Sequence, residues 1–234
     1  TWSLSRGQLS LVDGAVGESE GRGGAKSNVL LLIAHPDDEA MFFVPTLLAI
    51  RERYTVHVLS MSNGDFDGLG KTREEELRKS CSLLGVPSDR VTVVDDPGLQ
   101  DGKGNHWDEE HIEFHLLPFI KREKIEAIVS FDEQGVSGHP NHIALHSALV
   151  KLRKAGRFPP KLRLLKLQSV PIWRKFIGPL AALEPGAGGL SAFSIDLPLV
   201  HRALQAHRSQ AVWYRLLFII FGRYTFANTL RDIE

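Results

Sequence analysis

The residues best suited to chemistry lie in two short motifs that share one form. Residues 34–39, Ala-His-Pro-Asp-Asp-Glu, place a histidine and three carboxylates directly after an apolar run, and residues 138–142, Gly-His-Pro-Asn-His, again place proline directly after a histidine. Each motif offers two candidate ligands three positions apart, His35 with Asp38 and His139 with His142. Two histidines and an aspartate are a common ligand set for a catalytic zinc ion that keeps one position open for water. The two motifs together therefore predict a site for a divalent metal ion.

Helix capping is the alternative interpretation of both motifs. Asp37, Asp38 and Glu39 open a helical pattern, and the helix dipole favours carboxylates at a helix N-terminus. His35 and His139 would then be ordinary helix-terminal residues. The spacing also leaves open which of Asp37 and Asp38 would bind a metal ion and which would act as a base. Two motifs of one form, each after a predicted strand, favour the metal interpretation.

The elements that must position these motifs alternate along the chain. Apolar runs predict strands at residues 29–33, 55–61, 91–94 and 125–131, with helices beginning near residues 37, 72, 107 and 139. Such alternation predicts one α/β domain with a Rossmann-like, doubly wound, mostly parallel sheet. If the strand order is 3-2-1-4, the loops after the first and fourth strands border the crevice at the topological switch point. The two histidine motifs would then face each other.

The boundaries of the domain and of its later elements follow from composition and local signals. Residues 1–27 are rich in glycine, serine and charged residues, so we interpret them as a flexible linker before a domain at residues 28–234. Thr72 with Glu75 forms a capping-box pattern, which predicts that a helix starts at Thr72. Later strands are expected at residues 164–168 and 192–195, followed by a helix over residues 200–210.

Composition excludes several classes of protein. Lys plus Arg equals Asp plus Glu at 28 each in 234 residues, so no basic excess indicates nucleic acid as a partner. A single cysteine, Cys81, excludes an intrachain disulfide and is expected to be buried. No apolar run reaches the length of a transmembrane helix. Because the chain begins with Thr1 rather than Met, the hypothesis that a signal or membrane anchor precedes it stays open.

These motifs resemble those of the PIG-L, or LmbE-like, de-N-acetylases. The family hallmark stands at residues 34–39, and the resemblance extends from residue 28 onward, including residues 72–76, 138–142 and 207–210. The second histidine motif is most similar to the eukaryotic branch, since bacterial relatives tend to carry Asp where Asn141 stands. That branch removes the N-acetyl group of N-acetylglucosaminyl-phosphatidylinositol, the second step of glycosylphosphatidylinositol (GPI) anchor synthesis, at the cytoplasmic face of the endoplasmic reticulum membrane.

The resemblance also implies a role for individual residues. It implies that His35, Asp38 and His142 bind zinc, that Asp37 is general base and acid, and that His139 stabilises the oxyanion. Residue chemistry agrees, because an amide carbonyl is a poor electrophile that a metal ion polarises, and a nearby unbound carboxylate can carry the proton. The ligand set would in principle also accept iron, cobalt or manganese. Protein partners cannot be inferred.

The resemblance implies further substrate-binding residues, each with a simpler alternative. Arg73 would hold phosphate, or it would be an exposed helix-start arginine. Asp96 would accept hydrogen bonds from sugar hydroxyls, or it would cap a turn. His207 and Arg208 would lie near the site, or they would form a polar helix face.

The remaining candidates are less specific. Glu39 is expected to support the site or start the helix, whereas His146, four residues after His142, is not expected to bind metal. Residues 213–221 could lie in a membrane interface or form a final core helix.

Overall fold

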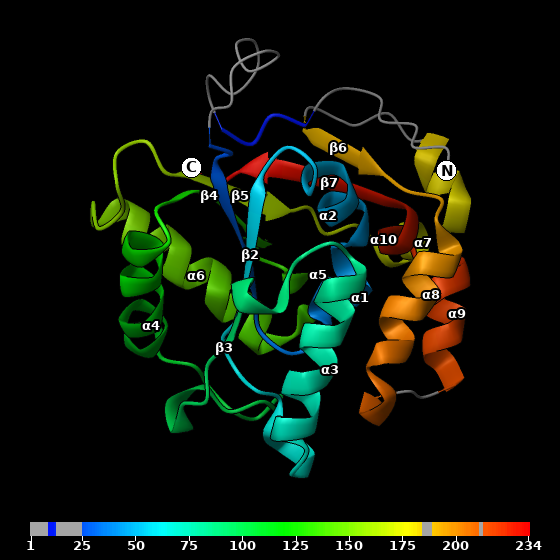
Figure 1. The fold of residues 1–234 in the computed structure, drawn as a ribbon, viewed down its shortest axis with the longest axis horizontal. Helices are drawn as coiled ribbons and strands as arrows, with labels where there is room; N and C mark the ends of the chain where they lie inside the picture. Colours follow the sequence, from blue (N-terminus) through cyan, green and yellow to red (C-terminus); the bar gives the residue numbers. More distant parts are fainter. Residues whose placement is uncertain (1–8, 13–24, 184–188, 211–212) are drawn as a thin grey trace.

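The first strand, β1 (Asn28–Ile33), lies between β2 (Thr55–Ser60) and β4 (Ile125–Phe131) and is buried along nearly its whole length. Its leucines, valine and isoleucine pack on both faces, as a central strand covered by helices requires. These observations come from a computed structural model, which describes residues 9–12, 25–183, 189–210 and 213–234. Figure 1 shows the strands enclosed by helices.

The sheet has seven strands in the order β3-β2-β1-β4-β5-β7-β6. β3 (Val91–Val93) and β5 (Arg163–Leu167) pair in parallel with β2 and β4, so the sheet has the order 3-2-1-4 on which the facing of the two motifs depended. β7 (Ala227–Asp232), which the sequence did not predict, pairs antiparallel with both β5 and β6 (Leu190–Phe193). The result is one mostly parallel α/β sheet, as predicted.

Helices cover both faces of this sheet. In chain order they are α1 (Asp38–Phe42), α2 (Val44–Ile50), α3 (Gly70–Leu83), α4 (Glu109–Arg122), α5 (Gly135–Gly138), α6 (Pro140–Lys154), α7 (Ile172–Lys175), α8 (Leu197–Ala206), α9 (Trp213–Phe221) and α10 (Arg223–Phe226). Short 3-10 turns add η1 (Asp65–Asp67), η2 (Ser88–Arg90), η3 (Pro97–Leu99), η4 (Gly178–Leu183) and η5 (Arg208–Gln210). α4 packs on α6, whereas α3 packs on α8 and α8 on α9, which places the two groups on opposite sides in Figure 1.

Two predicted helix starts are wrong for the same reason. α3 begins at Gly70 rather than at Thr72, because the Asp65 carboxylate accepts a hydrogen bond from the Gly70 amide at 2.6 Å. α8 begins at Leu197 rather than near residue 200, because the Asp196 carboxylate accepts from the Leu199 amide at 3.1 Å. In each case a side chain earlier in the chain satisfies a free amide of the first turn.

Part of the predicted linker packs against the domain. Leu9 and Leu11 are buried in the main hydrophobic core, and the Leu11 amide donates to the Tyr54 hydroxyl at 2.9 Å. The linker prediction did not anticipate this contact, and residues 1–8 and 13–24 lie outside the described part of the chain. Cys81 is buried, as predicted. Within the described ranges, no helix has the length and apolar character needed to cross a membrane.

Candidate active site

Three histidines from the two motifs meet at the carboxyl ends of β1 and β4. His35 follows β1, whereas His139 and His142 follow β4 at the start of α6. Their ring centroids lie 4.8 Å apart for His35 and His139, 5.4 Å for His35 and His142, and 5.1 Å for His139 and His142. One ring nitrogen of each lies within 4.8 Å of the others, close enough for the three to hold one metal ion. The predicted convergence of the motifs is confirmed.

Asp38 joins this cluster from the first turn of α1. Its Oδ1 lies 3.2 Å from His142 Nε2, while its Oδ2 accepts hydrogen bonds from the amides of Ala34 and His35 at 3.0 and 2.9 Å. Burial raises the pKa of the Asp38 carboxyl, but the charge and hydrogen bond of His142 outweigh burial and leave that pKa below its ordinary value. Asp38 is therefore a carboxylate at neutral pH, the form that binds a cation.

His142 is oriented by contacts behind the cluster. Its Nδ1 donates to the Gly135 carbonyl at 3.0 Å, and its ring stacks on Phe131 with centroids 3.9 Å apart. Burial lowers the pKa of His142, but the Asp38 carboxylate outweighs burial and leaves the pKa raised. A hydrogen bond that fixes one ring nitrogen and presents the other is the usual support of a metal-binding histidine. Gly135, at φ 56°, permits this approach, because a Cβ there would lie 2.9 Å from His142 Cβ.

The cluster has the donor properties that a metal ion needs. Among the described residues, His35 Nε2 and His139 Nδ1 are buried and form no hydrogen bond. His35 Nε2 does lie 3.1 Å from Asp101 Oδ1, but the two groups are not aligned for a hydrogen bond. Burial lowers the pKa of His35, and burial with the neighbouring histidines lowers that of His139 to about 4. Neutral imidazoles beside an ionised carboxylate fit zinc and similar divalent ions.

Asp37 occupies an unusual backbone conformation next to the cluster. Its φ is 123°, a value that residues other than glycine rarely adopt and that costs about 1–3 kcal/mol. Its amide donates to Glu39 Oε2 at 3.1 Å, and its Oδ2 lies 3.7 Å from Arg73 Nη2. The side chain is mostly buried, and its charge acts on both His35 and His142. The surrounding contacts thus hold Asp37 close to the predicted metal ligands.

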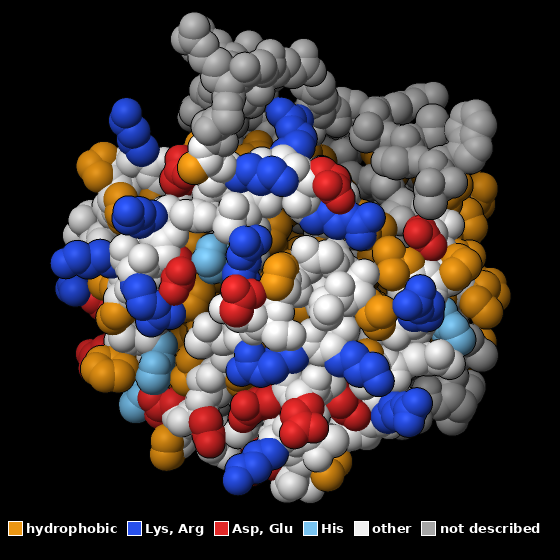
Figure 2. Space-filling model, in the orientation of Figure 1, with side chains coloured by type: hydrophobic (Ala, Val, Ile, Leu, Met, Phe, Trp, Pro, Cys, Tyr) orange, Lys and Arg blue, Asp and Glu red, His pale blue; other side chains and the backbone are white. Residues whose placement is uncertain are grey.

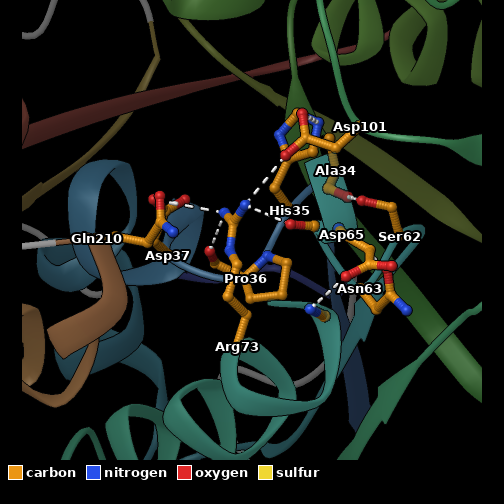
Figure 3. A network of polar contacts seen from close by, with 12 residues as sticks. Ala34, His35, Pro36, Asp37, Ser62, Asn63, Asp65, Arg73, Asp101 and Gln210 are labelled. Carbon is orange, nitrogen blue, oxygen red and sulfur yellow. Dashed lines mark hydrogen bonds and ion pairs between the residues drawn. The ribbon is translucent and has the colours of Figure 1, made fainter. Parts of the chain in front are cut away.

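Arg73 connects three loops at this end of the sheet (Figure 3). Its Nη2 donates to the Pro36 carbonyl at 2.8 Å, and its Nη1 donates to the Gly64 carbonyl at 2.8 Å and to Asp101 Oδ2 at 3.0 Å. The side chain is buried, so the alternative of an exposed helix-start arginine is wrong. Both terminal nitrogens already bind protein oxygens, and phosphate binding by Arg73 stays a prediction.

The acidic loop after β3 contributes Asp101, which sequence reasoning missed. Asp101 contacts both Arg73 and His35. The predicted Asp96 instead accepts from the Gly98 amide at 2.7 Å and lies 2.6 Å from His115 Nε2 and 3.3 Å from His111 Nδ1. The hydrogen bond with His115 lowers the pKa of Asp96 to about 2. Sugar binding by Asp96 stays a prediction, and Asp101 is the acid of this loop that contacts His35 and Arg73; the signal for it was the density of acids between residues 95 and 101.

Glu39 links the loop after β1 to the C-terminal part of the chain. It is 0% exposed; its Oε1 accepts from Ser80 Oγ at 2.5 Å and lies 2.7 Å from His207 Nε2. Because Glu39 Oε2 also accepts the Asp37 amide, Glu39 supports the site rather than merely starting a helix. His207 is buried against Glu39, so the alternative of a polar helix face is wrong for it.

The segment around Arg208 lies against α3. The Ser209 amide and hydroxyl donate to the two carboxylate oxygens of Glu76 at 2.8 and 2.6 Å. Arg208 itself is exposed, and its role in substrate binding stays a prediction. His146 lies outside the histidine cluster, with its Nε2 3.7 Å from Glu133 Oε2.

Comparisons with known proteins extend this description. The model of the PIG-L family, described as GlcNAc-PI de-N-acetylase, matches residues 30–152. The N-acetylglucosaminyl-phosphatidylinositol de-N-acetylase of Bos taurus is 37% identical over 218 residues, covering 91% of this chain and 86% of that protein. The enzyme of that name from Saccharomyces cerevisiae is 33% identical over 240 residues, covering 85% of this chain and 79% of that protein. The structure of N,N'-diacetylchitobiose deacetylase from Pyrococcus horikoshii superposes with a TM-score of 0.65 at 17% identity, covering 88% and 84% of the two chains.

Proposed function

This chain belongs to the GlcNAc-PI de-N-acetylase family, and we propose that it hydrolyses the N-acetyl group of N-acetylglucosaminyl-phosphatidylinositol, releasing acetate in the second step of GPI-anchor synthesis. The observation that carries this proposal is the convergence of three histidines and Asp38 at the carboxyl ends of β1 and β4. The similarity to eukaryotic enzymes named for this lipid spans most of the chain, which supports the choice of substrate.

We infer that His35, Asp38 and His142 hold one divalent metal ion, and we propose zinc as that ion. The lowered pKa of His35 and the ionised Asp38 support this ligand set, and the Gly135 carbonyl keeps His142 turned toward Asp38. His139 lies close enough to share in binding the ion. When bound, the ion would polarise the amide carbonyl and lower the pKa of water toward neutrality.

Asp37 carries the proton in this proposal. Its carboxylate takes a proton from the attacking water and later returns it to the nitrogen of the departing glucosamine. The Glu39 carboxylate and the strained backbone fix the position of Asp37, which limits the reorganisation that proton transfer requires. His139 offers one N–H to the oxygen of the tetrahedral intermediate, because its lowered pKa keeps the imidazole neutral.

Arg73 and Asp101 hold the loops around the metal ligands in this proposal. Arg73 joins the loop after β1 to the loop after β2, and Asp101 adds the loop after β3. We also propose that the enzyme works at the cytoplasmic face of the endoplasmic reticulum membrane, because the lipid substrate resides in a bilayer and the family resemblance implies that location.

The decisive experiment compares two substrates that share the sugar and differ in the lipid. We expect hydrolysis of N-acetylglucosaminyl-phosphatidylinositol in mixed micelles to exceed that of water-soluble N-acetylglucosaminyl-inositol, with Asp37→Asn as the inactive control. A bacterial relative, 26% identical over 159 residues, is named for deacetylating 1D-myo-inositol 2-acetamido-2-deoxy-alpha-D-glucopyranoside. Equal turnover of the two substrates would favour that soluble class and remove the lipid assignment. Failure of metal-loaded protein to hydrolyse either one would favour an inactive scaffold.

A further inference from the structure

Exposed apolar side chains are concentrated in the C-terminal part of the described chain. We define the C-terminal apolar surface as the large hydrophobic residues that are substantially exposed after β5, namely Ile172, Trp173, Phe176, Leu180, Leu183, Ile195, Leu197, Leu217, Ile220 and Phe221. Among the described residues before β5, the comparable side chains are Phe66, Leu69 and Phe114. Soluble proteins rarely expose many large apolar side chains together unless the surface binds something.

The elements that carry this surface pack against one another. α9 contacts both α8 and η4, and α10 contacts both α7 and η4. Gly178, at the start of η4, lies against the end of α9, because a Cβ there would be 3.0 Å from the Ile220 carbonyl oxygen. In Figure 2, hydrophobic side chains gather along the edge near α8. The exposed residues thus belong to one region of the molecule.

The same region has an excess of positive charge. The whole chain balances 28 basic against 28 acidic residues, yet residues 169–226 have acids only at Glu184 and Asp196. Their basic residues are Arg174, Lys175, Arg202, Arg208, Arg215 and Arg223, of which Arg223 is buried and does not contribute to the surface. Apolar and aromatic side chains flanked by arginine and lysine are the composition of segments that lie in the interface of an anionic membrane.

A series of contacts joins this surface to the loop after β1 (residues 34–39). α8 packs on both α1 and α3, and His207, directly after α8, contacts the Glu39 carboxylate. Glu39 in turn accepts the hydrogen bond from the Asp37 amide. Docking of this region on a bilayer would therefore also tether the loop after β1 to the membrane.

We propose that the C-terminal apolar surface docks on an anionic phospholipid bilayer and inserts Trp173 and Phe176 into its interface. The proposal rests on the proposed function, because a substrate anchored by its acyl chains must be met at the membrane surface. The local excess of basic residues favours a bilayer over a second copy of the chain, since two copies would bring like charges together.

The test measures sedimentation of the protein with vesicles. Vesicles of phosphatidylcholine with about a third phosphatidylinositol are compared with phosphatidylcholine alone. We expect Trp173→Ser to weaken binding to the anionic vesicles about tenfold, because the membrane contact of a large aromatic side chain is lost. Phe114→Ser is the matched control, since Phe114 is 73% exposed on α4 and Trp173 is 71% exposed on α7. Phe176→Ser provides a second variant in case Trp173→Ser fails to fold.

Hydrolysis of soluble N-acetylglucosaminyl-inositol is measured on the same samples. We expect the surface variants to retain this activity while they lose activity on vesicle-embedded lipid. Absence of wild-type binding to anionic vesicles, or equal binding by Trp173→Ser and Phe176→Ser, would overturn the docking proposal. A wild-type dimer that Trp173→Ser dissociates would assign the surface to a second copy and also overturn it. Failure of the proposed function is distinguishable, because the wild type would then hydrolyse neither substrate whatever its membrane binding.

Discussion

The histidine site and the C-terminal apolar surface depart from the ordinary distribution of side chains in opposite directions. At the site, the charged or titratable side chains of His35, Asp38 and Arg73 are buried, whereas Trp173 and Leu183 are apolar and exposed. Burying polar groups and exposing large apolar groups both cost free energy in the isolated chain. The difference suggests two kinds of ligand. A bound cation would offset the free-energy cost of burying the donor side chains, and a lipid surface would offset the cost of exposing the apolar side chains.

The largest effect is expected for substitution of Asp37, which should change the reaction rate and leave the binding of metal and membrane unchanged. Asp37→Asn should lower the deacetylation rate by about 10²–10⁴, because the carboxylate that carries the proton is lost. Metal content and binding to anionic vesicles should not change. Steady-state rates on both substrates, with metal analysis of the same preparation, check this prediction. A rate within threefold of the wild type would exclude Asp37 as the base.

A second effect is expected at Glu39, which joins the two regions. Glu39→Gln should lower the free energy of unfolding by about 1–3 kcal/mol, because the buried charge that binds Ser80 and His207 is removed. Chemical denaturation measures the change. The matched control is Glu113→Gln, which loses only a partly exposed ion pair with Arg157 and should change the free energy by less than about 1 kcal/mol. Equal effects of the two substitutions would contradict a linking role for Glu39.

Truncation of one leucine in the core below the histidine site and of one in the C-terminal apolar surface should change the free energy of unfolding by very different amounts. Leu31→Ala, in the centre of β1, should cost about 2–5 kcal/mol of folding free energy, since it leaves a cavity in the core. Leu183→Ala should change stability by less than about 0.5 kcal/mol, because Leu183 is 79% exposed. Thermal and urea unfolding of the two variants test the pair. A large loss for Leu183→Ala would show that this surface is structural.

The smallest effect at an ion-paired residue is expected for Asp96, which lies beside His111 and His115, and it depends on pH. The pKa of Asp96 is about 2 in the folded chain, below its value of about 3.9 in an unfolded chain. Its contribution, about 1 kcal/mol after allowance for solvent, is therefore present above about pH 4 and is lost as the pH falls toward 2. Asp96→Asn should flatten the dependence of unfolding free energy on pH in this window, whereas substitution of the exposed Asp89 should not. An unchanged slope in Asp96→Asn would contradict the assigned pairing with His115.

Sequence periodicity was sufficient for the central part of the fold and for the meeting of the two motifs. The apolar runs of β1 and β4 indicated strands inside the sheet, and supposing the order 3-2-1-4 of Rossmann-like sheets placed His35 and His142 side by side. β7 could not be predicted in this way, because its sequence Ala-Asn-Thr-Leu-Arg-Asp has no apolar run and its partners lie far away in the sequence.

The other differences arise from contacts that local sequence does not encode. The 3-10 turn at Pro97–Leu99 decides which acid of the loop after β3 lies near the histidine cluster. It places Asp96 against His115, whereas Asp101 accepts a hydrogen bond from Arg73. The burial of His207 depends on Glu39, which lies 168 positions earlier. Such side-chain pairs form only after the sheet and helices have been assembled.

Metal stoichiometry tests the central claim most directly. Purified wild-type chain, loaded with zinc and freed of excess ion, should contain one zinc per chain by elemental analysis. His142→Ala should contain almost none while keeping its circular dichroism spectrum. An active wild-type enzyme without metal, or a His142→Ala variant that retains one zinc per chain, would contradict the claim that the histidines after β1 and β4 share one ion.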